Sequence, residues 1–237
     1  MMKRTTISTL LIKILGIWAS VMYILVFFLT FQDPISRAVV GMAGGLAVLW
    51  IIIGGTIMLK SRHRVRRLVL NLPGGWKSKF VLFATALALI EEAITTTMTN
   101  LAPAFGAKVG EAYITASADY LDVVLFHSVI VFIPMFVAWA WLLSRYDFDA
   151  KSVFILFGIT GTLAEALTFG VQNLGAAGFW VFVYGLMVFL PAYTLPQDRG
   201  AEKPRPWHYP LAVVVPFAFA IPVALIVSLI HPIQVHF

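Results

Sequence analysis

The stretch FVLFATALALIEEAITTTMT, residues Phe80–Thr99, decides the fold. It is apolar over most of its length, and about 20 such residues form an α-helix that crosses a hydrocarbon core of about 30 Å. The stretch also carries two adjacent acids, Glu91 and Glu92, close to its middle. It therefore predicts a membrane-spanning helix with ionisable groups inside the bilayer.

The rest of the chain has the same apolar character. Of its 237 residues, 60% are hydrophobic and 12% are charged, and the mean hydropathy is +0.91. This composition excludes an ordinary water-soluble domain. The chain has no cysteine, which excludes disulfides, iron–sulfur clusters and thiolate zinc sites.

Seven stretches are long and apolar enough to span a bilayer. We expect one all-α domain over residues 1–237, a polytopic membrane bundle of seven transmembrane helices, with the N-terminal run kept as the first helix because no signal-peptide cleavage pattern follows it. Pro191, Pro216 and Pro222 predict kinks in the last two helices. The predicted spans are 14–31, 38–59, 80–99, 123–143, 153–173, 176–196 and 211–230.

Lysine and arginine are distributed unevenly between the predicted loops. If the N-terminus is cytoplasmic, Arg37 and Lys108 are the only two of the 17 basic residues outside. Because basic loops stay inside, we expect a cytoplasmic N-terminus and an external C-terminus, in the inner membrane of a prokaryote. The net charge of +6 then reflects orientation, and we expect no nucleic-acid partner. The run from Lys60 to Arg67 is either a site for anionic lipid head groups or a plain topology anchor.

Four ionisable residues lie inside predicted spans: Glu91, Glu92, His127 and Glu165. Glu92 and Glu165 each lie about 18 Å from the inner edge of their spans, and His127 roughly 24 Å from it. An acid at this depth costs about 2.5–3.5 kcal/mol on insertion scales, so such residues face protein or trapped water. We expect the four to meet inside the bundle. The alternative is that they are protonated or satisfied groups that only hydrogen-bond between helices.

Helical spacing indicates which neighbours accompany the acids. Glu92 shares a face with Thr96, and Asn100 lies at the margin of that face, whereas Glu91 points about 100° away. On the fifth span, Glu165 shares a face with glycines that would let another helix approach closely. These glycines are Gly158 and Gly161.

The third and fifth spans also share a pattern. Glu92-Ala93-Ile94-Thr95 with Asn100 matches Glu165-Ala166-Leu167-Thr168 with Asn173 at the same spacing. In the helices that follow, His127 aligns with Tyr184. The pattern predicts a two-fold site at the interface of a parallel helical-hairpin repeat, coincidence among apolar helices being the alternative.

An adjacent Glu-Glu pair in one membrane helix followed by a histidine in the next resembles the glutamate-type intramembrane proteases of the CAAX-processing and bacteriocin-immunity family. The resemblance rests on Glu91, Glu92 and His127, and Thr96 stands where the motif of that family continues with an arginine. It implies that Glu92 or Glu91 activates water with assistance from His127.

Three functions are compatible with the pattern. The first is an intramembrane hydrolase or lipid-modifying enzyme that uses Glu and His as acid and base. A metal held by Glu92, Glu165 and His127 is a variant of it, although no metal-binding signature is present and the cofactor stays unknown. The second is a small proton- or cation-coupled transporter, and the third is a scaffold without chemistry. The long segment between Asn100 and Leu121 is either a lid over the acids or a short surface helix.

Overall fold

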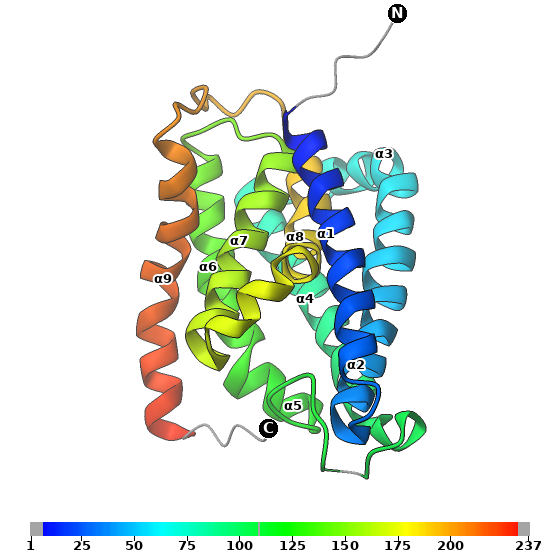
Figure 1. The fold of residues 1–237 in the computed structure, drawn as a ribbon. Coiled ribbons are helices and arrows are strands. Elements are labelled where there is room, and N and C mark those ends of the chain that lie inside the picture. Colours follow the sequence, from blue (N-terminus) through cyan, green and yellow to red (C-terminus); the bar gives the residue numbers. More distant parts are fainter. Residues whose placement is uncertain (1–6, 109, 232–237) are drawn as a thin grey trace, which may run out of the picture.

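The computed structural model describes residues 7–108 and 110–231 and shows a bundle of long helices (Figure 1). Six helices in this part of the chain are long and apolar enough to cross a membrane, or seven if a bent pair counts as one span. The predicted all-α polytopic bundle is confirmed. The helices are α1 (Ile7–Leu29), α2 (Pro34–Leu46), η1 (Ala47–Gly54), α3 (Gly55–Asn71), α4 (Trp76–Asn100), η2 (Ala102–Phe105), α5 (Tyr120–Asp122), η3 (Val123–His127), α6 (Val129–Leu143), α7 (Ala150–Phe169), η4 (Val171–Ala176), α8 (Ala177–Tyr193) and α9 (His208–Ile230).

The second span is longer than predicted. Helices α2, η1 and α3 run on from Pro34 to Asn71, 38 residues in all, because the basic residues beyond Leu59 are good helix formers. Asp33 caps the start, its side chain accepting a hydrogen bond from the backbone N–H of Ser36 at 2.9 Å. Hydrogen bonding by Ser36 lowers the pKa of the Asp33 carboxyl.

The fourth span is bent where no bend was predicted. Helices α5 and η3 meet α6 at an angle of 46°, and Ser128 between them has non-helical backbone angles. Helix η3 is a π-helical turn, a feature that is frequent at functional sites. Helices α8 and α9 are unbroken at Pro191, Pro216 and Pro222, and the kinks expected at these residues stay a prediction.

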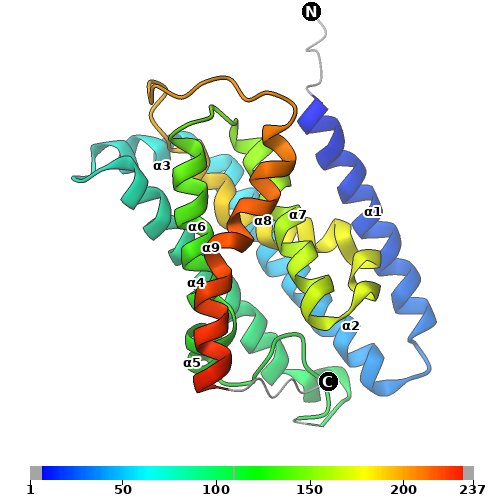
Figure 2. The same cartoon turned by 90° about the vertical axis from the view of Figure 1, so that its left-hand side faces the viewer.

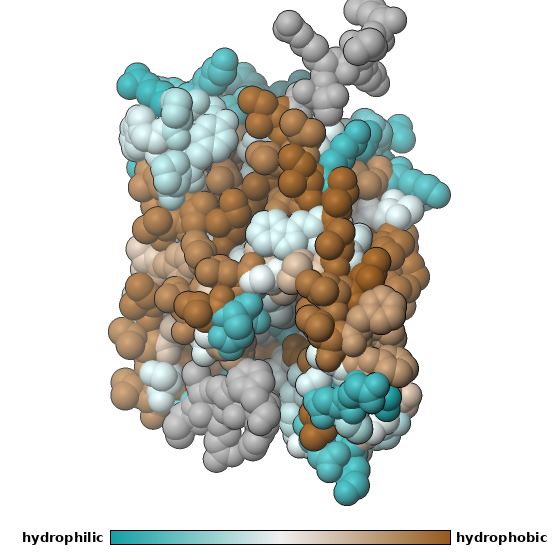
Figure 3. All heavy atoms as spheres, in the orientation of Figure 1, coloured by the Kyte–Doolittle hydropathy of each residue, from teal (hydrophilic) through white to brown (hydrophobic). Residues whose placement is uncertain are grey.

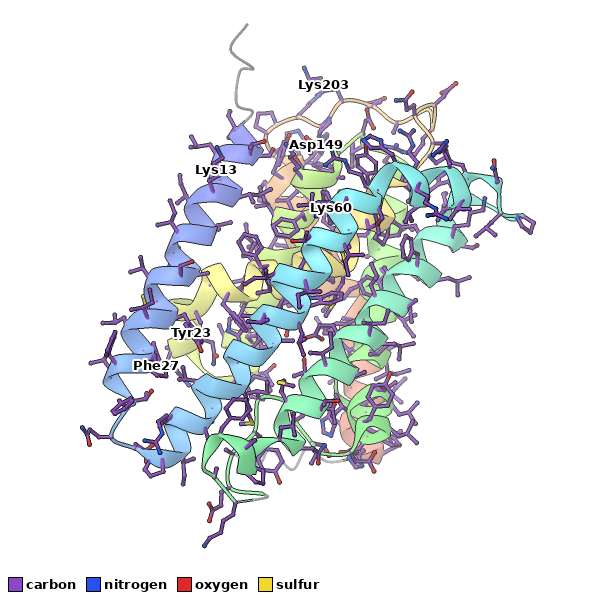
Figure 4. All side chains as sticks on the ribbon, turned by 90° about the vertical axis from the view of Figure 1, so that its right-hand side faces the viewer. Lys13, Tyr23, Phe27, Lys60, Asp149 and Lys203 are labelled. Atoms are coloured by element: carbon purple, nitrogen blue, oxygen red, sulfur yellow. The ribbon has the colours of Figure 1, made fainter. Side chains whose placement is uncertain are left out.

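Charge divides the two ends of the bundle. Apart from Arg37 and Lys108, the lysines and arginines of the described chain lie in α3, in the first turns of α1, α4 and α7, and in the α6–α7 and α8–α9 connections. These segments lie together, as the labelled Lys13, Lys60 and Lys203 show (Figure 4). We call this the basic end, and the opposite end, with residues 101–119, the loop end. Lys3 and Arg4 lie outside the described residues, and the sidedness of the membrane stays a prediction.

The surface between the two ends is mainly apolar on the face shown in Figure 3, as expected of a bundle in contact with lipid. Helix α1 has no buried residue and lies at the side of the bundle (Figure 2). It is anchored where Gly178 of α8 approaches it, because a Cβ there would lie 2.7 Å from the backbone oxygen of Leu15.

Helices α7 and α8 form the centre of the bundle. A Cβ at Gly158 would lie 2.5 Å from the backbone oxygen of Val181, and one at Gly185 would lie 2.7 Å from that of Phe154. The glycines therefore bring the two backbones together, as predicted for Gly158. Fully buried aromatic side chains of α4, α6 and α7 fill the half of the bundle toward the basic end, which we call the packed half. They are Phe80, Phe136, Trp139 and Phe157.

Candidate active site

A cavity of about 170 Å³ lies in the half of the bundle toward the loop end, which we call the cavity half. The cavity is lined by the four ionisable residues that the sequence analysis placed inside the spans, namely Glu91, Glu92, His127 and Glu165. Helices α4, η3 and α7 supply them, so the structure brings these residues of three spans together. We call this space the acidic cavity.

The adjacent acids of α4 both face this cavity. Glu91 and Glu92 are buried, with 4% and 6% of their surface exposed. The Thr95 hydroxyl donates a hydrogen bond to Glu91 Oε1 at 2.8 Å, and the Ser128 hydroxyl interacts with the Glu92 carboxyl. Helical spacing alone favoured Glu92, but the cavity is wide enough for side chains that diverge by about 100° on one helix.

Glu165 of α7 is paired with a residue of α8. The Tyr184 hydroxyl donates a hydrogen bond to Glu165 Oε1. The Tyr184 ring lies directly against Gly161, where a Cβ would be 2.1 Å from the ring atom Cγ. Glycine at position 161 is therefore what allows the tyrosine ring to lie flat on α7 and reach the acid one turn further along.

A second, larger cavity of about 470 Å³ adjoins the first. Its walls come from α1, α2, η4, α7, α8 and residues 111–115, and most of its lining is apolar. We call it the apolar cavity. Six residues line both cavities: Leu46, Ile114, Thr115, Glu165, Phe169 and Trp180. Glu165 is the acidic residue among these six.

The segment between α4 and α5 covers both cavities at the loop end. Ile114 and Thr115 line both of them. The segment is held down by α4, since the backbone N–H of Ile114 donates to Thr99 Oγ1 at 3.3 Å and Asn100 Nδ2 donates to the Ala118 carbonyl at 2.9 Å. The predicted position of a lid is thus occupied by a cover with one 3₁₀ turn, η2, and not by a surface α-helix.

Three predicted binding residues lie elsewhere. Asn100 lines neither cavity, because its amide holds the covering segment. Thr96 also lines neither, and its buried hydroxyl has no hydrogen-bond partner among the described residues. Asn173 lines the apolar cavity, with its amide donating to the Gly170 carbonyl at 3.3 Å. The expected two-fold arrangement therefore does not extend to the asparagines, since α7 ends at Phe169, before Asn173, whereas α4 continues to Asn100.

His127 has a partner that the sequence did not indicate. Its Nε2 lies 3.3 Å from Asp122 Oδ2, and His231 Nε2 lies 2.9 Å from Asp122 Oδ1. On an α-helix, residues 122 and 127 would point about 140° apart. The π-helical turn of η3 instead brings them together, and no α-helical pattern could have shown it.

The predicted metal ligands Glu92, Glu165 and His127 do not form a compact ligand set. Among the described residues, the group whose ligand atoms lie within 4.8 Å of one another is Asp122, His127 and His231. No protein-family model, curated protein or solved structure matches this chain.

Proposed function

We propose that this multi-pass membrane protein is an intramembrane hydrolase that cleaves an ester or amide bond at the end of an apolar chain. The observation that carries the proposal is the junction of the two cavities at Glu165. An apolar space of about 470 Å³ beside a small acidic one suits a substrate with a long apolar part and one polar, reactive group.

The buried carboxyls supply the groups that hydrolysis requires. Glu91 and Glu92 lie side by side in the acidic cavity with Thr95 and Ser128 as hydrogen-bonding neighbours. One of these carboxylates would accept a proton from a water molecule as its oxygen attacks the substrate carbonyl carbon. The Glu91–Glu92 pair is also what resembles the glutamate-type intramembrane proteases.

Glu165 and Tyr184 face the same cavity from the other side. In the proposed reaction, the Tyr184 hydroxyl turns from Glu165 Oε1 to the substrate and donates its hydrogen bond to the carbonyl oxygen, on which negative charge develops. The carbon–oxygen or carbon–nitrogen bond then breaks, and the leaving group takes the proton that the carboxylate received from water. His127 lines the cavity as well and has a positioning role, since its Nε2 is occupied by Asp122.

A proton-coupled transporter is the second candidate, and one observation favours it. The span that carries His127 is broken at Ser128, next to Glu92, and broken helices beside acids are common at transporter sites. However, the lining of both cavities comes from the cavity half, while Phe136, Trp139 and Phe157 fill the packed half. A site confined to one half of the bundle suits an enzyme better than a transporter.

Anionic lipids are proposed as partners at the basic end. In α3, Arg62 lies over the Tyr193 ring, with its Cζ 5.6 Å from the ring centroid, and Arg66 donates to the Leu195 carbonyl at 3.3 Å. Lys60, Arg64 and Arg67 are exposed. Each exposed cation near an anionic surface contributes about 1 kcal/mol, so these three suit a phosphate-bearing membrane surface.

The experiment is hydrolysis by the purified protein in nanodiscs. Nitrophenyl esters and nitroanilides of long and short acyl chains are the probes, in water labelled with oxygen-18. We expect label in the released acid and a preference for long chains. Glu92→Gln and Glu165→Gln should lower kcat by about 100-fold or more, whereas Glu202→Gln, at an exposed position at the basic end, should leave it unchanged.

Two results would contradict the proposal. The first is release of acid from every probe at no more than the rate measured in nanodiscs without the protein. The second is proton flux into liposomes, followed with a pH-sensitive dye, that depends on Glu92 and Glu165 while hydrolysis does not. That second result would establish the transporter instead.

A further inference from the structure

We infer that Asp122, His127 and His231 form a binding site for a divalent transition metal ion at the loop end. His127 and Asp122 come from one bent span, and His231 follows the last turn of α9. The site joins segments that are distant in sequence and lie at the same end of the bundle (Figure 1, Figure 2).

The spacing of the ligand atoms suits a small metal ion. Zinc bonds of about 2.0–2.2 Å in a tetrahedron place neighbouring ligand atoms about 3.3–3.6 Å apart. Here Asp122 Oδ2 lies 3.3 Å from His127 Nε2, and Asp122 Oδ1 lies 2.9 Å from His231 Nε2. The ligand atoms of all three residues lie within 4.8 Å of one another. The two Asp122–histidine distances are within about 0.4 Å of this spacing, whereas a pair at the 4.8 Å limit would have to close by about 1.2 Å to complete the coordination.

The chemistry of the donors selects the class of metal. Two imidazoles and one carboxylate suit zinc and its neighbours, whereas calcium and magnesium prefer oxygen ligands throughout. Three protein ligands leave a fourth position for water. The exposed fractions of the side chains are 7% for His127, 26% for Asp122 and 37% for His231, so an ion has access from the side of His231.

The surrounding structure holds the ligands in place. The π-helical turn of η3 aligns Asp122 with His127. The Phe126 ring stacks on the His231 ring, with centroids 4.5 Å apart and planes 27° from parallel. Asp119 caps the short helix α5, accepting from the backbone N–H of Leu121 at 2.8 Å. These contacts fix ring and carboxyl orientations before a metal binds, which lowers the entropic cost of binding.

Metal uptake by the purified protein tests this inference. The protein is prepared without a histidine tag, stripped with a chelator, and titrated with Co²⁺ and Zn²⁺, with absorption spectroscopy and elemental analysis as readouts. We expect one equivalent of metal and a visible Co²⁺ spectrum typical of low coordination number. His231→Ala and Asp122→Asn should weaken binding by at least about 10-fold, the effect that even outer-shell partners have.

Matched variants separate this site from adventitious binding and from misfolding. His63 lies near the basic end, where its Nδ1 lies 3.1 Å from the Tyr193 hydroxyl, so His63→Ala should bind metal as the wild type does. His231→Cys should restore uptake and add a thiolate-to-cobalt charge-transfer band, which is unambiguous because the chain has no other cysteine.

The outcomes do not depend on hydrolysis. Glu165→Gln should retain full metal uptake even though it abolishes the proposed reaction. Stoichiometric binding that His231→Ala leaves intact, or no binding above that of the Asp122→Asn variant, would show that the three residues are only a hydrogen-bonded cluster.

Discussion

The packed half and the cavity half of this bundle are built from the same helices, yet they are filled differently. In the packed half, α6 and α7 contribute Phe136 and Phe157, whose ring centroids lie 5.4 Å apart. In the cavity half, the same two spans contribute Ser128 and Glu165 to the lining of a cavity.

The difference shows what each half contributes. Inside a bilayer, helices associate through close packing and polar contacts, since lipid is as apolar as the core. The packed half meets that need with aromatic side chains and glycine contacts. The cavity half instead holds two buried acids, Glu91 and Glu92, and a partly buried one, Glu165, which add cost to insertion in a bilayer and are not needed for packing.

The largest expected effect is at the closest approach of α7 and α8. Gly158→Ala would place a Cβ 2.5 Å from a backbone oxygen, and the two helices must move apart. We expect a loss of about 3 kcal/mol, the upper part of the range for overpacking, in unfolding by denaturing detergent. The control is Gly55→Ala, whose Cβ would lie 3.6 Å from its nearest atoms. Equal losses of stability in the two variants would show that the close approach of α7 and α8 at Gly158 is not what makes that position sensitive.

A smaller effect is expected from removing an aromatic ring in the packed half. Phe136→Ala deletes about 100 Å³ of a fully buried side chain, and at about 24 cal/mol per Å³ the cavity costs about 2 kcal/mol. The water-transfer contribution is absent, because the unfolded helices remain in lipid. Unfolding in mixed micelles would measure the loss. A matched deletion in the cavity half, Phe169→Ala, should lower the free energy of unfolding by less. A larger loss in Phe169→Ala than in Phe136→Ala would contradict the distinction between a packed half and a cavity half.

The smallest effect on stability is expected where space already exists. Ala43 lines the apolar cavity, so Ala43→Phe should change the free energy of unfolding by about 0.5 kcal/mol or less. If the apolar cavity holds the substrate chain, this variant should lower hydrolysis of long-chain esters more than that of short-chain esters. If Ala43→Phe changed the hydrolysis of long-chain and short-chain esters by the same factor, the apolar cavity would not be where the substrate chain binds.

Much of the fold was predictable, because hydropathy and length alone define membrane-spanning helices. The convergence of Glu91, Glu92, Glu165 and His127 on one cavity also follows from the cost of placing such residues against lipid. Asp122 was missed, because its contact with His127 depends on a departure from regular helix geometry. The π-helical turn of η3 places the two side chains together.

The positions of Asn100 and Asn173 were not predictable for the same reason. They occupy equivalent places in the sequence pattern, but α7 ends at Phe169, and the next residue, Gly170, has a positive φ of 104°. The chain leaves the helix there, and Asn173 lies in the 3₁₀ helix η4. The apolar cavity could not be predicted from the sequence either, because it depends on how α1 and α2 are placed and not on any motif.

The long second span sets the geometry around the apolar cavity. Its apolar part, from Pro34 to Leu59, is about 39 Å long at about 1.5 Å per residue, and a hydrocarbon core of about 30 Å accommodates it only with a tilt of about 40°. This oblique course is visible beside α1 in Figure 4, and it leaves a wedge between the two helices. A lipid environment of greater hydrophobic thickness would bring the span upright and narrow that wedge, so membrane composition would set how large a molecule the protein can accept.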